Sequence, residues 1–99
     1  MTAAEATLEI VNLKGLHARA AAKFVKIAGA YAGTEATVAK LGQEGAADSA
    51  TVAGTSILGL MMLGADQGSR LRVAAVGPDA DRLVEELSLL VSSRFGEEE

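Results

Sequence analysis

The stretch LEIVNLKGLHARAAAKFVKIAGAY, residues 8–31, changes its hydrophobic period halfway along. Residues Leu8–Val11 follow the alternating pattern of a strand that is half-buried on one face. From Ala18 to Tyr31 the apolar residues recur at helical spacing instead. We therefore predict a strand, a turn over Asn12–Gly15, and a helix that begins just after His17.

The predicted helix has two distinct faces. Its core-facing stripe consists of Ala21, Phe24, Val25, Ala28 and Tyr31. A second, basic face carries Arg19, Lys23 and Lys26 at positions i, i+4 and i+7. Gly33 is expected to end the helix, because glycine readily adopts the left-handed conformation that follows a last helical turn.

The rest of the chain repeats these two patterns. Strands are predicted over residues 34–41, 50–52 and 70–74, with Ala36, Val38, Leu71 and Val73 pointing inward. Helices are predicted over Ile57–Leu63 and from the Gly77–Asp79 turn through Val91. Residues 42–48 form a loop, and the ends 1–6 and 95–99 are expected to be frayed.

The resulting order is β-α-β-β-α-β-α. One four-stranded antiparallel sheet with three helices packed on one face satisfies this order economically. The fold class is therefore α+β, an open-faced sandwich. A chain of 99 residues is long enough for one core, so residues 1–99 form a single predicted domain.

Composition excludes several classes of function. Nine basic residues against thirteen acidic ones give a net charge of −4, which argues against a nucleic-acid partner. With no cysteine and one histidine, the chain lacks the residues for thiol chemistry or a histidine-rich metal site, so we expect no metal and no cofactor. The N-terminal residues lack the pattern of a secretion signal, and the longest apolar run is too short to span a bilayer. We expect a cytoplasmic monomer without membrane insertion.

The single histidine, His17, lies at the predicted helix start. Backbone N–H groups are unpaired at such a position, and the helix dipole favours an anion there. An imidazole is partly neutral and nucleophilic at cellular pH, so it suits both accepting and returning a phosphoryl group. Arg19, in the first helical turn, places a positive charge at the positive end of the helix dipole. This placement is unfavourable unless a phosphate on His17 offsets the charge. A packing histidine and an ordinary solvated arginine are the competing interpretations.

The segment Ile57–Leu63 is apolar around its whole axis, whereas a single-sheet protein covers only one side of a short helix. Leu60 and Leu63 are predicted to face inward. Ile57, Leu58 and Met61 then remain outside as a candidate partner-binding patch, with complete burial as the alternative. The basic residues Arg19, Lys23 and Lys26 are candidates for steering an acidic partner, or simply a solvated face.

Ser56 precedes this segment and has two compatible roles. Its hydroxyl is a good helix N-cap, and it can also be phosphorylated. A phosphate there adds a charge of about −1.5 to −2 beside the apolar patch and is expected to weaken docking.

Two motifs, residues 15–25 and residues 56–61 followed by Leu63-Gly64, together resemble those of HPr, the histidine-containing phosphocarrier family of the bacterial phosphotransferase system. The resemblance extends from about Leu8 to Val91. It implies that His17 is phosphorylated on Nδ1 by enzyme I, with phosphoenolpyruvate as the ultimate donor. It also implies onward transfer to EIIA-type proteins, by a carrier that is not itself an enzyme.

The same resemblance makes Ser56 the counterpart of the family's regulatory serine, the target of HPr kinase/phosphorylase. Two departures stand out. Ala20 replaces the family's usual proline and keeps a backbone N–H, a feature similar to the nitrogen-type, regulatory branch. Residues 42–49 are long and rich in glycine and alanine where the family has a tight hairpin.

Two other functions compete with the carrier. An enzyme using His17 as general base is disfavoured, because no Ser, Cys or carboxylate is spaced with it as a dyad or triad requires. A regulatory interaction module, whose phosphorylation state controls a metabolic or stress-response partner without onward transfer, stays open.

Overall fold

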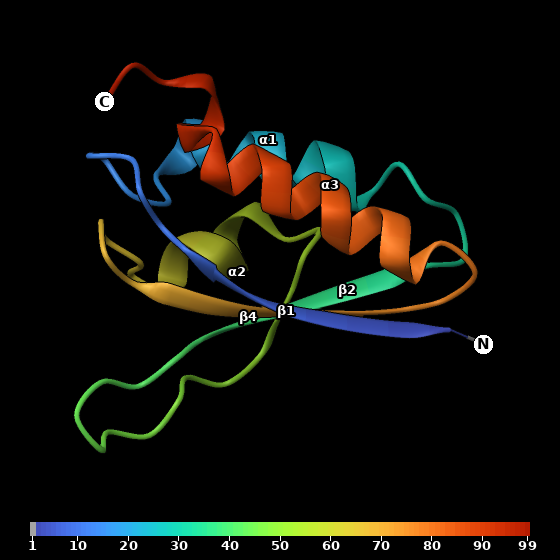
Figure 1. The fold of residues 1–99 in the computed structure, drawn as a ribbon, viewed down its shortest axis with the longest axis horizontal. Coiled ribbons are helices and arrows are strands. Elements are labelled where there is room, and N and C mark those ends of the chain that lie inside the picture. The colour runs from blue at the N-terminus through green and yellow to red at the C-terminus, as the bar shows by residue number, and fades with distance from the viewer. Residues whose placement is uncertain (1) are drawn as a thin grey trace.

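The computed structural model describes residues 2–99 and contains one sheet layer and one helix layer (Figure 1). Met1, part of the predicted frayed end 1–6, lies outside the described residues. The elements are β1 (Ala3–Glu9), α1 (Ala18–Ala28), β2 (Glu35–Lys40), β3 (Val52–Ala53), α2 (Ile57–Met62), β4 (Arg70–Val76), α3 (Ala80–Ser92) and the short 3-10 turn η1 (Arg94–Gly96). The four strands form one antiparallel sheet in the order β1-β4-β2-β3, and the helices cover one face of it. The predicted open-faced α+β sandwich is confirmed.

The core lies between the sheet and the helices. Leu8 of β1 pairs with Leu71 of β4, and Val38 of β2 pairs with Val73 of β4, so their side chains share the covered face. The strand residues predicted to point inward, Ala36, Val38, Leu71 and Val73, are all buried. Helix α3 buries Ala80, Leu83, Val84, Leu87 and Val91. This core fixes α1 over the sheet and thereby fixes the start of α1, where His17 lies.

Helix α1 ends earlier than the hydrophobic pattern predicts. It stops at Ala28, with Gly29 as its C-cap, rather than at Tyr31. Of the predicted stripe, Ala21, Phe24 and Ala28 are buried and the other two residues are half-buried. Gly29 weakens helix propensity by about 1 kcal/mol, which favours the early end.

The first strand begins earlier than the predicted Leu8–Val11. Strand β1 starts at Ala3 and pairs along its whole length with β4, which itself continues to Val76. Thr2 also exchanges hydrogen bonds with Gly77, its Oγ1 donating over 2.9 Å and its carbonyl accepting over 2.9 Å. Fraying of residues 2–6 is therefore a wrong prediction, because the ladder compensates for the weak strand propensity of alanine. Strand β3 instead begins later than the predicted 50–52 and spans Val52–Ala53.

The C-terminal segment also contradicts the prediction of a frayed end over 95–99. Phe95 is completely buried, and η1 turns the chain back over the start of α1. Arg94 and Phe95 have positive φ angles of 60° and 54°, each a left-handed conformation that costs about 1–2 kcal/mol. Burying the phenylalanine contributes about 1.5–3 kcal/mol and offsets most of the combined cost of the two residues. We call residues 94–99 the C-terminal strap.

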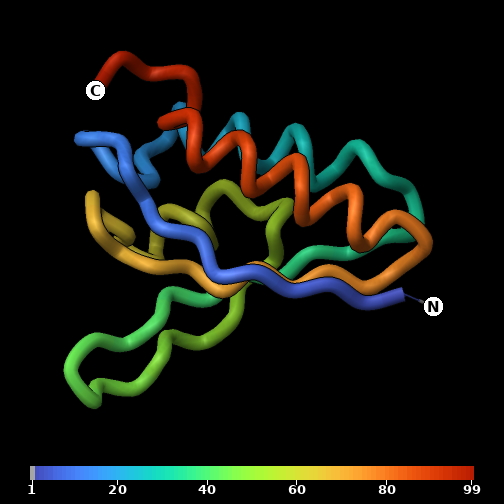
Figure 2. The backbone as a smooth tube through the Cα atoms, in the orientation of Figure 1, coloured from blue at the N-terminus to red at the C-terminus, as the bar shows by residue number. Residues whose placement is uncertain are grey.

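The predicted loop at 42–48 belongs to an arm, residues 41–51, that projects on the side of the sheet away from the helices (Figures 1 and 2). Ser49 closes its base: its N–H donates to the carbonyl of Lys40 and its Oγ accepts from the N–H of Lys40, both over 2.8 Å. The N–H of Gly42, and after it Arg72, holds the pKa of Asp48 below its usual range. The arm is thus a defined projection, but it lies away from the histidine.

Candidate functional site

The loop before His17 has a conformation that only glycine accepts easily. Gly15 has a φ of +69°, and a Cβ there would come within 2.5 Å of the carbonyl oxygen of Ala65. The next residue, Leu16, is buried and donates its N–H to that same oxygen over 2.9 Å. The close approach of the two loops sets where His17 begins the helix.

His17 is the N-cap residue of α1, as predicted. Its backbone is extended, with φ −79° and ψ 179°, and its carbonyl accepts the first helical hydrogen bond, from Ala21 over 2.8 Å. Its side chain makes no capping bond, so the imidazole is not occupied by the helix. The N–H groups of Ala18, Arg19 and Ala20 make no hydrogen bond to another residue of 2–99. Ala18 and Arg19 are exposed, so their N–H groups are available to an anion, whereas Ala20 is buried.

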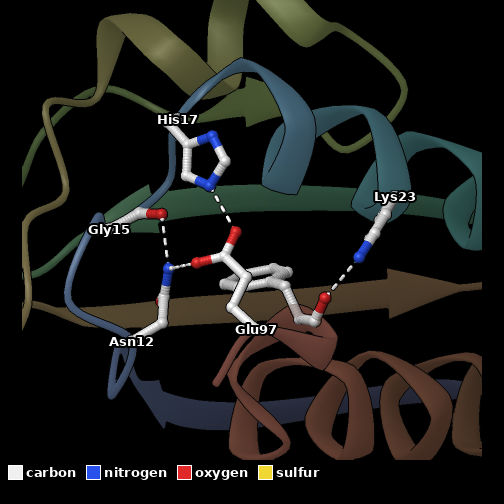
Figure 3. Close-up of polar contacts among 6 residues, drawn as sticks. Asn12, Gly15, His17, Lys23 and Glu97 are labelled. Carbon is white, nitrogen blue, oxygen red and sulfur yellow. Dashed lines mark hydrogen bonds and ion pairs between the residues drawn. The ribbon is translucent and has the colours of Figure 1, made fainter. Parts of the chain in front are cut away.

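A carboxylate from the far end of the chain meets the imidazole (Figure 3). Oε2 of Glu97 contacts Nε2 of His17, while Oε1 of Glu97 accepts from Nδ2 of Asn12 over 3.0 Å. The other ring nitrogen, Nδ1, points away from the carboxylate and has no hydrogen-bond partner within the described chain. The His17 side chain is 28% exposed and that of Glu97 is 18% exposed, so both side chains are partly shielded but still reach solvent.

The electrostatics of this pair favour an ionised Glu97. The hydrogen bond from His17 lowers the pKa of Glu97, and the hydrogen bond from Asn12 and the charge of Lys14 act in the same direction against partial burial. An ionised carboxylate can only accept hydrogen bonds, so Nε2 is the ring nitrogen that carries hydrogen. Whenever the imidazole is neutral, this arrangement leaves the lone pair on Nδ1, where it can act as a nucleophile.

Sequence reasoning missed Glu97, because a carboxylate that far from His17 gives no spacing signal. The one available signal was Phe95, an aromatic residue inside an otherwise polar and acidic end. An aromatic side chain is more stable buried than exposed, so its presence predicts docking rather than fraying.

Asn12 connects the loop to the strap. It is completely buried, and its Nδ2 donates both to the carbonyl of Gly15 over 2.9 Å and to Glu97. Its Oδ1 has no partner among residues 2–99. This single amide therefore orients the backbone before His17 and the carboxylate after it.

The predicted basic face of α1 is divided by the strap. Lys23 is half-buried and its Nζ donates to the carbonyl of Phe95 over 2.5 Å, whereas Arg19 and Lys26 are exposed. Arg19 lies in the first turn, as expected, and borders a shallow hollow together with Leu13, Lys14 and residues 97–99. Its guanidinium makes no ion pair within residues 2–99.

Helix α2 exposes the predicted apolar patch. Leu60 is fully buried and Leu63 nearly so, while Ile57, Leu58 and Met61 are 41%, 69% and 43% exposed. Ser56 caps the helix, its Oγ accepting from the N–H of Gly59 over 3.0 Å. Met62 of the same helix, 76% exposed, was not singled out from the sequence.

Residues 2–99 contain no cluster of three or more His, Cys, Asp or Glu side chains arranged to hold a metal ion. None of the helices in that range has the length and apolar character needed to cross a membrane.

An open-faced sandwich with one histidine at a helix start is the architecture of a small phosphocarrier. Comparisons with known proteins support this class. The family described as "PTS HPr component phosphorylation site" matches residues 4–93. A phosphocarrier protein HPr of Pseudomonas aeruginosa is 39% identical over 92 residues, covering 93% of this chain and 94% of the relative. One from Cupriavidus necator is 37% identical over 90 residues, covering 91% and 92%. The crystal structure of HPr-C-His from Thermoanaerobacter tengcongensis has a TM-score of 0.81 at 36% identity, covering 97% of this chain and 99% of that one.

The chain belongs to the HPr family of the bacterial phosphotransferase system, and its role is that of a phosphocarrier.

Proposed function

We propose that His17 accepts a phosphoryl group on Nδ1 from phosphorylated enzyme I, with phosphoenolpyruvate as the ultimate donor, and passes it to EIIA-type proteins. The observation that carries this proposal is the position of His17. It is the N-cap of α1, with Nε2 bound to Glu97 and Nδ1 free of hydrogen bonds to residues 2–99. A ring nitrogen in that state is ready to attack a phosphorus atom.

The first turn of α1 supplies the charge stabilisation for the transfer. The N–H groups of Ala18, Arg19 and Ala20 lack acceptors within residues 2–99, and phosphate oxygens on Nδ1 are suited to accept from them. Ala20, in place of the family's usual proline, adds one such donor. Arg19 is exposed and without an ion-pair partner in the described chain, so its guanidinium is available to bind the transferring group.

The apolar patch on α2 is the proposed docking surface for enzyme I and EIIA-type proteins. Ile57, Leu58 and Met61 are exposed beside α1, which contacts α2, and Lys26 adds an exposed positive charge for steering. Lys23 is the weaker candidate for partner binding, since it already donates to the strap.

Ser56 is the proposed regulatory site, phosphorylated by HPr kinase/phosphorylase where that enzyme is present. Its Oγ lies at the start of α2 next to the patch and is only partly buried. A phosphate there remains compatible with a helix N-terminus but places negative charge against an apolar docking surface.

Incubation with enzyme I and labelled phosphoenolpyruvate tests the proposal. The expected product is acid-labile, alkali-stable label on the wild-type chain and none on His17→Ala. Label on His17→Ala would contradict the assignment. Adding an EIIA-type acceptor separates the carrier from the regulatory alternative. Movement of the label from His17 to the acceptor supports the carrier. Label that stays on His17 supports a module that signals without onward transfer.

A further inference from the structure

The C-terminal strap lies beyond residues 4–93, the segment that the family model matches. It is nevertheless held in place by several contacts with the rest of the protein. Phe95 is fully buried, its carbonyl accepts from Lys23, and the N–H of Leu13 donates to the backbone oxygen of Glu99. These three contacts come from the core, from α1 and from the loop before His17. They hold Glu97 between Asn12 and His17 (Figure 3).

We propose that Glu97 is a positioning residue for phosphoryl transfer: by accepting a hydrogen bond from Nε2 it keeps the imidazole of His17 in the tautomer whose lone pair is on Nδ1. This inference rests on the proposed function, because it assigns a role in transfer through His17. It adds a residue to the site from outside the matched segment.

For a neutral ring, the hydrogen-bond pattern leaves one consistent arrangement. Asn12 Nδ2 donates to Oε1 of Glu97, which fixes the carboxylate, and Oε2 then faces Nε2. If Nδ1 carried the hydrogen of a neutral ring, two acceptors, Oε2 and the bare Nε2, would face each other. The Nε2–H tautomer is therefore the favoured one, and the same hydrogen bond orients the ring with Nδ1 pointing away from the carboxylate.

The transfer step balances without moving the Nε2 hydrogen. The Nδ1 lone pair forms a bond to phosphorus while the nitrogen–phosphorus bond of the donor phosphohistidine breaks, and the donor nitrogen keeps that electron pair. When the donor ring is protonated on its other nitrogen, it leaves as neutral imidazole. His17 becomes a phosphoimidazolium that still carries Nε2–H. The carboxylate of Glu97 stabilises the positive charge that develops on this ring.

Single-turnover transfer from phosphorylated enzyme I, at saturating donor, tests the role. Glu97→Gln is the informative variant, because its amide has one acceptor oxygen: if that oxygen stays with Asn12, its NH2 faces Nε2 and favours the wrong tautomer. We expect the rate to fall at least about 10-fold in Glu97→Gln and Glu97→Ala. Glu44→Gln, an exposed glutamate of the arm that loses the same charge away from the site, is the matched control and is expected to transfer at the wild-type rate.

Ring nitrogen NMR of neutral His17 supplies a readout that a merely structural strap would not move. We expect the Nε2–H tautomer to dominate in the wild type and in Glu44→Gln, and Nδ1–H to rise in Glu97→Gln. Equal tautomer populations and equal rates in Glu97→Gln would overturn the positioning role while leaving the proposed function intact, provided that His17→Ala is unlabelled. Faster transfer in Glu97→Gln would also overturn it, since the strap would then obstruct the donor. Label on His17→Ala would instead be a failure of the proposed function.

Discussion

Asn12 and Glu97 are 85 residues apart in the chain and are joined by a hydrogen bond of 3.0 Å in the candidate site. The same amide group of Asn12 donates to Gly15, so one buried side chain orients both sides of His17. The imidazole is therefore placed by a loop and a strap that meet at a shared residue.

Removing this amide is expected to destabilise the fold. Asn12→Ala loses two hydrogen bonds and leaves the carbonyl of Gly15 without its partner, so we predict a loss of about 1–3 kcal/mol in the free energy of unfolding. Urea unfolding checks the value. Gln67→Ala is the matched control, since Gln67 is exposed and donates to the carbonyl of Val11 over 3.2 Å; its cost should stay within about 0.5 kcal/mol. Similar losses in both variants would contradict the special role of Asn12.

Phe95 is predicted to be the main source of strap stability. Phe95→Ala removes a completely buried aromatic ring and should cost about 3–5 kcal/mol in the free energy of unfolding. Leu89→Ala on α3 is the control, because Leu89 is 61% exposed and its loss should be small. Equal effects of the two substitutions on thermal unfolding would mean that the phenylalanine is not packed as described.

Most of the fold was predictable from local patterns. Alternation placed Val38 and Leu71 inward and helical spacing placed Phe24, because period and burial are linked residue by residue. Boundaries failed where pairing or capping decided them. The alanine-rich residues 3–6 form a strand only because β4 is beside them, and Gly29 ends α1 before Tyr31.

The candidate site was predictable only in part, for a similar reason. His17 and Ser56 lie at helix starts, which sequence marks through turn residues and caps. Glu97 reaches the site through tertiary packing of Phe95, and Lys23 is diverted from the basic face by the same strap. Contacts between distant parts of the chain carry no periodic signal in one sequence.

The depressed pKa of Glu97 predicts a specific pH dependence of stability. Its folded pKa lies below the unfolded value of 4.5, chiefly because His17 donates to it. The stabilisation is therefore complete above pH 4.5 and is lost as the pH falls through the folded pKa. Unfolding free energies of the wild type and Glu97→Gln, measured from about pH 7 to about pH 3, should differ by a constant amount near neutrality and converge in acid. A difference that grows as the pH falls would contradict the assignment.

Ser56→Asp is expected to separate folding from docking. Aspartate is a good N-cap and preserves the start of α2, whereas Ser56→Ala loses the bond to Gly59 and should cost about 1 kcal/mol. Only the aspartate adds negative charge beside Leu58. We therefore predict slower transfer from phosphorylated enzyme I at subsaturating donor in Ser56→Asp, and near wild-type transfer in Ser56→Ala. Unchanged transfer in Ser56→Asp would exclude the α2 patch as the docking surface.

The last prediction concerns Gly15, whose conformation determines where the helix of His17 begins. A side chain there meets two separate penalties. The φ of +69° is left-handed, which costs about 1–3 kcal/mol for a non-glycine residue. The added Cβ would also lie 2.5 Å from the carbonyl oxygen of Ala65, so the two loops must move apart.

Gly45 in the arm isolates the first penalty. It has a φ of +86°, and a Cβ added there would meet no heavy atom within 4 Å, so Gly45→Ala carries the conformational strain without the collision. We predict that Gly15→Ala destabilises the protein by about 1–3 kcal/mol more than Gly45→Ala, the cost of overpacking. Because the collision displaces the loop that leads into His17, Gly15→Ala should also slow phosphorylation while Gly45→Ala does not. Equal unfolding free energies for the two variants would mean that the loops at 15 and 65 do not approach closely, and the placement of His17 would then need another cause.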